Sequence, residues 1–218
     1  MLCENQVLID NPVDYQGQTL MEFHLIYAGG LIKSANAKGV VWEKHAIRHH
    51  LHAQMKRLWE THPALHEYAS RTIEEQGRPP IKFLDNLAHS YERAGIGFIP
   101  LMTASNGLVC SLDILFLRSD RPGTILQSGG DIDNRIKFLI DALRIPSDAS
   151  EMRKRPSDEP DPNPMYCLLQ DDKLITTLRV KTDRLLFTMG DAANEACVII
   201  RVETAQVDPF GSPWELHL

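Results

Sequence analysis

The stretch "GGDIDNRIKFLIDALRIP", from Gly129 to Pro146, decides the fold that we expect for this chain. Its apolar residues recur at helical spacing and predict one buried stripe, formed by Ile132, Ile136, Leu139, Ile140 and Leu143. Pro146 cannot continue a helix and marks its end. Because strand patterns stand before and after this amphipathic helix, the sequence predicts an α/β fold.

The other elements follow from the same periodicities. A first strand is expected around Phe23–Tyr27, a central strand over 107–117, and two later strands at about 173–180 and 196–203. A helix is expected over 42–59, and residues 64–95 are interpreted as further helix, interrupted by "GRPP" at 77–80. The interleaving predicts a single mixed sheet with packed helices.

The chain divides into one main domain with less regular ends. Residues 1–18 are expected to be a flexible N-terminal arm, 19–207 the main domain, and 208–218 a C-terminal tail. Within the domain, residues 147–166 are rich in proline and poor in apolar side chains. This composition predicts a disordered-like insertion on the surface.

Composition sets limits on the class of protein. A chain of 218 residues with 43% hydrophobic residues can build one large core. No apolar run approaches the roughly 20 residues that cross a bilayer, so no membrane partner is expected. The cysteines are scattered, and Cys110 and Cys197 lie in apolar strand patterns, which favours buried thiols in a reducing cytoplasm.

The formal charge of −6 argues against a nucleic-acid partner, but the charges are unevenly distributed. Basic residues gather near the expected helix over 42–59 and in the proline-rich insertion. We interpret them as candidate phosphate contacts: Lys33, Lys38, Lys44, Arg48, Lys56, Arg57, Arg153, Lys154 and Arg155. The alternative is an ordinary solvated helix face, and the insertion is either a mobile basic patch, a spacer or a segment that binds a partner.

Two pairs of acids allow two interpretations. In the first, Asp131 caps the helix, Asp133 pairs with Lys137, and Asp171-Asp172 marks a polar turn. In the second, carboxylates from both pairs converge to bind Mg²⁺, which prefers oxygen ligands. His45, His49 and His52 at i, i+4 and i+7 could hold zinc, although surface histidines are the commoner outcome.

The segments "DIDNRIKFLIDAL" and "DDKLITTLRVKT" resemble the RusA family of Holliday junction resolvases. The shared pattern is D-x-D-N, a lysine four residues after the second aspartate, Asp-Ala-Leu on the same helix, and an Asp-Asp pair before a strand. The resemblance implies that Asp131, Asp133 and Asp172 bind the metal and that Lys137 is catalytic. Asn134 and Asp171 fall on motif positions with a supporting role.

The resemblance also implies a function. We expect a RusA-like, Mg²⁺-dependent endodeoxyribonuclease of DNA recombination and repair, with Mn²⁺ as a substitute metal. It would act as a homodimer on four-way junctions and make paired symmetric nicks. The acidic charge and the proline-rich insertion depart from the family pattern. Two alternatives therefore stay open: a branched-DNA or general nuclease of a phage or mobile element, and a non-catalytic DNA-binding or interaction module.

Overall fold

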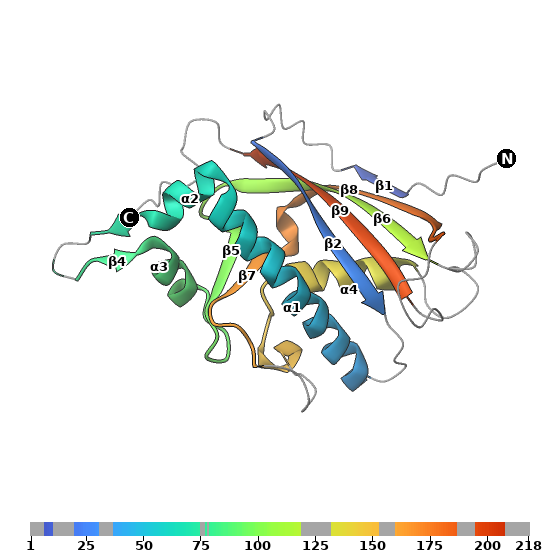
Figure 1. The fold of residues 1–218 in the computed structure, drawn as a ribbon, viewed down its shortest axis with the longest axis horizontal. Helices are drawn as coiled ribbons and strands as arrows, with labels where there is room; N and C mark the ends of the chain where they lie inside the picture. The colour runs from blue at the N-terminus through green and yellow to red at the C-terminus, as the bar shows by residue number, and fades with distance from the viewer. Residues whose placement is uncertain are drawn as a thin grey trace.

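The computed structural model describes residues 7–10, 20–30, 37–74, 77, 79–118, 132–152, 160–186 and 195–207. Figure 1 shows a twisted sheet with helices packed against it and a smaller group of helices and strands beside it. The mixed α/β class expected from the sequence is confirmed. Among the described residues, no helix is both long and apolar enough to span a membrane.

The main sheet contains β1 (Val7–Asp10), β2 (Met21–Gly30), β6 (Leu108–Arg118), β8 (Ile175–Arg184) and β9 (Glu195–Gln206). Its strand order is β1-β8-β6-β9-β2. Strands β6 and β8 are parallel, whereas the other neighbours are antiparallel. The sheet is therefore mixed, and β2 forms one of its edges.

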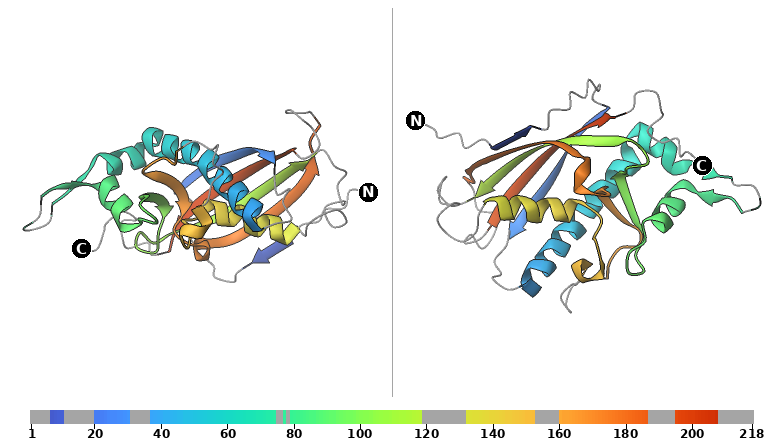
Figure 2. Two further views of the ribbon diagram at one scale, coloured as in Figure 1. Left: turned by 90° about the horizontal axis from the view of Figure 1, so that it is seen from below. Right: turned by 180° about the vertical axis from the view of Figure 1, so that it is seen from behind.

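One face of this sheet is buried and the other is open. Alternate residues such as Leu25, Leu112 and Ile200 are almost completely buried. Helices α1 (Ala37–Thr61) and α4 (Ile132–Leu143) lie side by side against this face (Figure 2). On the open face Arg201 of β9 forms ion pairs with Glu22, Asp113 and Glu203, as expected for a solvated side of an antiparallel arrangement.

A smaller unit packs beside the main sheet. Strands β5 (Phe98–Met102) and β7 (Met165–Leu169) pair in parallel, and α2 (Pro63–Ser70) and α3 (Phe83–Ser90) lie next to them. A short hairpin of β3 (Thr72–Ile73) and β4 (Ile81–Lys82) joins the two helices. Two 3₁₀ turns complete the described elements: η2 (Ala149–Met152) and η3 (Asp172–Leu174).

Several expectations need correction. The single sheet is wrong for the described residues, which form one five-stranded and two two-stranded sheets. Strands β5 and β7 were not expected because every residue in them is buried, so neither shows the alternation typical of a half-exposed strand. The helical stretch expected over 64–95 is interrupted, as predicted, but the β3–β4 hairpin makes the break wider than the expected 77–80.

The two ends of the proposed insertion are more ordered than the composition indicates. Met152 and Met165 are buried and pack with Phe98 and Ile145 in a second small core. Residues 153–159 lie outside the described residues, so the structure describes only the two ends of the segment. At the N-terminus, β1 pairs with β8, which contradicts a loose arm for residues 7–10. The C-terminal tail, 208–218, lies outside the described residues.

The buried thiols are confirmed for Cys110 and Cys197, and Cys167 is buried as well. Burial raises the pKa of Cys110 and of Cys167 to about 12. These side chains therefore contribute to packing as small apolar groups.

The contact between α3 and the segment entering β5 generates a stability prediction. A Cβ at Gly97 would lie 2.9 Å from the Ala88 Cβ and 3.0 Å from the Ala88 carbonyl oxygen. Because a helix backbone cannot yield as a flexible side chain does, we expect Gly97→Ala to lower the free energy of unfolding by about 1–3 kcal/mol. Chemical denaturation followed by circular dichroism measures this change.

The opposite replacement nearby serves as the control. Ala94 has a positive φ of 52°, a backbone conformation that glycine adopts with less steric strain than alanine. Ala94→Gly should leave the stability unchanged or slightly raised. Equal losses from the two substitutions would contradict the proposed close contact at Gly97.

Candidate functional site

Helix α4 carries the polar residues of the proposed motif on its first turns. Ile136, Leu139 and Leu143 are buried, as the periodicity predicted. Asn134 and Lys137 are exposed because they lie on the other side of the helix. Asp131 lies outside the described residues, and for Asp133 the structure describes only the backbone, within the first turn of α4.

The second acidic pair lies on the turn between β7 and β8. Asp171 caps η3, and its Oδ1 accepts a hydrogen bond of 3.0 Å from the backbone N–H of Lys173. This hydrogen bond lowers the pKa of Asp171, and Arg144 lowers it further. Asp172 is exposed. Asp171 thus has a structural role as a cap, whereas Asp172 is open to solvent.

The two acidic elements lie at opposite ends of α4. Directly after the helix, Arg144 forms an isolated bridge with Leu169, and the N–H of Ile145 donates to the Leu169 carbonyl at 2.9 Å. Asp172 follows Leu169 closely in the chain. Figures 1 and 2 show β7 at the C-terminal end of α4, while the first turn lies near the end of β6. A helix of 12 residues is about 18 Å long.

This arrangement argues against a three-carboxylate site within one chain. Asp172 does not lie beside the first turn of α4, which carries Asp133. Among the side chains that the structure describes, which do not include those of Asp131 and Asp133, no group of three or more His, Cys, Asp or Glu residues could hold a metal ion. The fold therefore separates the Asp171-Asp172 turn from the backbone that carries Asp133.

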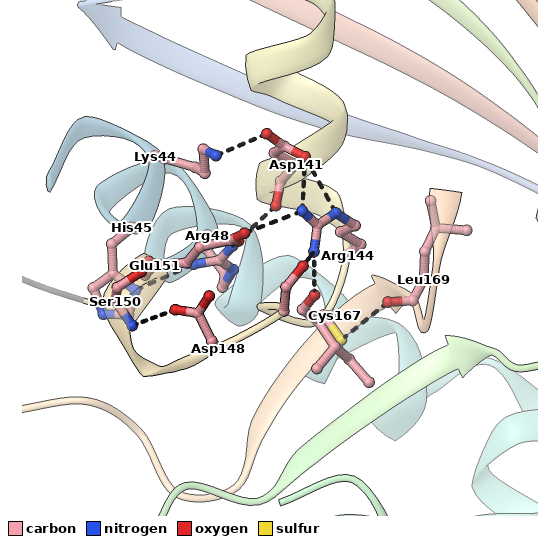
Figure 3. Close-up of polar contacts among 12 residues, drawn as sticks. Lys44, His45, Arg48, Asp141, Arg144, Asp148, Ser150, Glu151, Cys167 and Leu169 are labelled. Atoms are coloured by element: carbon pink, nitrogen blue, oxygen red, sulfur yellow. Dashed lines mark hydrogen bonds and ion pairs between the residues drawn. The ribbon is translucent and has the colours of Figure 1, made fainter. Parts of the chain in front are cut away.

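A largely buried ion cluster lies between α1 and α4, as Figure 3 shows. We name it the α1–α4 cluster, and its members are Lys44, Arg48, Asp141, Arg144 and Glu151. Lys44 Nζ lies 2.7 Å from Asp141 Oδ2, and Arg144 Nη2 lies 2.9 Å from Asp141 Oδ1. Arg144 Nη2 also lies 3.2 Å from Glu151 Oε1. Asp141 thus receives one cation on each carboxylate oxygen.

Arg48 is the most deeply buried member of the cluster, with 1% of its surface exposed. Its Nη2 donates to the Asp141 carbonyl at 2.9 Å and lies 3.8 Å from Glu151 Oε2. Loss of hydration on burial lowers the pKa of Arg48 to about 10. Burial alone would raise the pKa of Asp141, but Lys44 and Arg144 hold it below its ordinary value. Both groups therefore remain charged near neutral pH.

The cluster corrects the assignment of Lys44 and Arg48 as phosphate contacts. Lys44 contacts the Asp141 carboxylate and Arg48 donates to the Asp141 carbonyl. Arg48 is also too deeply buried to contact a phosphate. Lys56 and Arg57 are exposed, and Arg57 lies 3.7 Å from Glu60. Lys33 and Arg153, Lys154 and Arg155 lie outside the described residues, and Lys38 is described only by its backbone.

The histidines of α1 do not form a zinc site. His45 Nε2 lies 2.7 Å from Asp161 Oδ1, and His52 Nδ1 accepts a hydrogen bond of 2.9 Å from the backbone N–H of Tyr166. The His45 ring therefore contacts the segment before β7, and the His52 ring contacts β7 itself. Loss of hydration on burial lowers the pKa of His45, and it lowers that of His52 to about 4.

Part of the cluster has a signal in the sequence. Lys44 and Arg48 lie four positions apart, and the same helical line continues to Leu51 and Met55, which are buried. A cation in line with core residues lies at the margin of the buried stripe, which favours an internal partner over a phosphate. Arg144 and Glu151 have no such pattern, so the sequence does not identify them as the other half of the cluster.

The cluster generates a prediction for Asp141→Ala. The substitution leaves Lys44 and Arg144 facing each other without their shared carboxylate. We expect the free energy of unfolding to fall by about 3 kcal/mol, the value typical of breaking a buried pair. Arg57→Ala, which removes an exposed i,i+3 pair, should cost at most about 0.5 kcal/mol in the same denaturation experiment. Equal losses in the free energy of unfolding would show that the buried ion pairs of the cluster stabilise the protein no more than an exposed pair does.

His52 generates a prediction about pH. Its folded-state pKa of about 4 lies below the ordinary value of 6.5, so the folded protein binds the proton less readily than the unfolded chain. The stability from neutral His52 is complete above pH 6.5 and is lost as the pH falls towards 4. Denaturation at a series of pH values should show this loss.

The control is His52→Asn, whose side-chain oxygen can accept the Tyr166 N–H but cannot be protonated in this range. The variant should lose less stability than the unchanged protein between pH 6.5 and 4. An identical pH profile for both proteins would mean that His52 does not titrate as expected.

Comparisons with protein-family models, curated proteins and solved structures found no match to this chain.

Proposed function

We propose that this protein is a Mg²⁺-dependent endodeoxyribonuclease of the RusA type that acts on branched DNA as a homodimer. A four-way junction is the first substrate to test. The observation that carries the proposal is the contrast along α4: Asn134 and Lys137 of the motif are exposed, while Asp141 and Arg144 further along are held in the α1–α4 cluster. The side chains of Asn134 and Lys137 are thus available to a ligand.

The geometry bears on how a complete site would form. Within one chain, Asp172 lies at the opposite end of α4 from Asp133. In a two-fold dimer the two copies present the same surface to each other. Such a dimer can bring the first turn of α4 in one copy to η3 of the other. The proposed site therefore combines Asp131 and Asp133 of one chain with Asp172 of a second copy.

The chemistry of these side chains suits the proposed reaction. Carboxylates are the oxygen donors that Mg²⁺ prefers, and Mn²⁺ accepts the same ligands. When bound, the metal would polarise the phosphodiester and lower the pKa of the attacking water. Lys137 is one helical turn beyond Asp133, where its ammonium group can approach a charged phosphate oxygen. Asn134 can orient a carboxylate or donate to phosphate.

DNA contacts would come from basic residues outside the α1–α4 cluster. Lys56 and Arg57 are exposed on the second half of α1. Lys33, Lys38, Arg153, Lys154 and Arg155 remain candidates, whereas Lys44 and Arg48 are excluded by their place in the α1–α4 cluster. Contacts to phosphates position a nuclease without reading the bases.

A second candidate function is a DNA-binding or interaction module without catalysis. The separation of Asp172 from the first turn of α4 favours it, because a single chain then lacks a complete set of acidic ligands. A nuclease without preference for junctions is a third possibility. Cleavage of a junction, a fork and a linear duplex, with and without Mg²⁺, separates the three.

A hybrid dimer provides the sharpest test. Asp133→Asn and Asp172→Asn should each abolish cleavage when present in both copies, because every site then lacks one ligand. A hybrid with one substitution in each copy has one intact site and one doubly altered site. Co-expressed with two affinity tags and purified, it should nick one strand of the junction at about half the rate of the unchanged dimer.

Each outcome has a separate meaning. If the hybrid is as inactive as the single variants, the site is not shared between chains. If Asp133→Asn cleaves at the rate of the unchanged protein, the nuclease proposal fails. Asp85→Asn is the control, because Asp85 is an exposed acid on α3, in the smaller unit beside the main sheet, and should leave cleavage unaltered.

A further inference from the structure

Three rows of core-facing residues, on β6, β8 and α4, each end in an arginine at the same end of the molecule. On β6, the alternation that buries Ile114 and Phe116 continues to Arg118, the last residue of the strand. Arg118 is partly buried. It therefore belongs to the face of the main sheet that α1 and α4 cover.

Strand β8 places a second arginine beside Arg118. The two strands run parallel, and their register pairs Arg118 with Arg184, the last residue of β8. Paired residues of neighbouring strands lie on the same face, so Arg184 shares the face of the buried Val180, while Asp183 lies on the open face. Two like charges thus lie side by side at the carboxyl ends of two parallel strands, where an anion would stabilise them.

The third arginine comes from α4. Arg135 lies on one helical line with Leu139 and Leu143, four and eight positions further on, and all three side chains are buried. Arg135 is 7% exposed and belongs to the first turns of α4, which Figure 2 shows near the end of β6. It therefore lies on the core-facing side of α4, at the end of the sheet that carries Arg118 and Arg184.

An anion with several negative oxygens suits this arrangement. The carboxyl ends of parallel strands are the usual place for a ligand in an α/β sheet. Arginine binds phosphate oxygens through paired N–H donors, and its five donors allow it to bind an anion besides its contacts within the chain. Asn134 and Lys137 are exposed on the same turns of α4. A phosphate held by the arginines would lie at the end of α4 that carries the proposed nuclease motif.

We propose that Arg118, Arg135 and Arg184 form a binding site for a backbone phosphate of DNA at the carboxyl ends of β6 and β8. This inference rests on the proposed function, which supplies DNA as the occupant. A phosphate bound here positions the strand against the first turn of α4, so that a neighbouring phosphodiester can approach the motif. The site provides phosphate contacts that Lys44 and Arg48, held in the α1–α4 cluster, do not provide.

The test compares Arg184→Gln with the unchanged protein in binding a fluorescently labelled four-way junction. Anisotropy is measured at several salt concentrations in EDTA, which prevents metal-dependent cleavage. Arg184 is exposed, so the variant should keep its fold. We expect about tenfold weaker binding, because a charged hydrogen bond to phosphate is lost. The slope of log affinity against log salt concentration should fall in magnitude by about one.

Arg184→Lys separates charge from geometry. Lysine keeps the positive charge but lacks the planar pair of donors. This variant should keep the salt slope of the unchanged protein and lose only part of the affinity.

Arg179→Gln is the matched control. Arg179 is an exposed arginine of the same strand, but it lies on the open face, where it pairs with Asp113 at 3.5 Å. Its replacement should leave DNA binding unaltered. The inference is overturned if Arg184→Gln binds the junction with the affinity and salt slope of the unchanged protein, or if Arg179→Gln weakens binding as much.

Binding and cleavage are read separately, so the two proposals can fail independently. A protein that binds DNA through Arg184 but does not cut it with Mg²⁺ contradicts the nuclease and supports the phosphate site. A protein that cuts DNA and binds it equally well without Arg184 contradicts the phosphate site alone. Absence of any DNA binding overturns both.

Discussion

The Asp141 carboxylate links the last turn of α4 to α1 and to the chain that follows α4. Lys44 of α1 approaches one of its oxygens and Arg144 approaches the other, while Arg48 bonds the carbonyl of the same residue. Because these groups are mostly removed from water, each is tolerated only with its partners in place. The network fixes α4 against α1 and holds the chain that leaves α4 at Glu151.

This constraint extends to the candidate site. Arg144 belongs to the cluster and bridges Leu169, which lies just before the Asp171-Asp172 turn. The first turn of α4 and the Asp171-Asp172 turn are thus held by the same rigid element, about one helix length apart. Their separation is a property of the packed core, and small side-chain movements cannot remove it.

The sequence predicted the regular, half-buried elements well. α4, β6, β8 and β9 were expected near their observed positions because each has a clear period and a distinct apolar side. β5 and β7 could not be identified in this way because all their residues are buried. The sequence predicts the motif residues of the candidate site. Their spacing in the sequence does not determine whether the Asp171-Asp172 turn lies at the N-terminal or the C-terminal end of α4. Arg144 and Glu151 show the same limit, because no sequence pattern identifies them as partners of Lys44 and Arg48, which lie far away in the sequence.

The pairing of β2 with β9 has a consequence for how the protein is made. The Met21 N–H donates to Thr204 Oγ1 across 183 positions of the chain, and the two strands pair over the whole length of β2. The ribosome therefore synthesises β2 long before β9, and this side of the sheet cannot form until β9 has emerged. Because contacts this distant in sequence slow folding, β2 of the nascent protein lacks its partner strand until β9 has been synthesised.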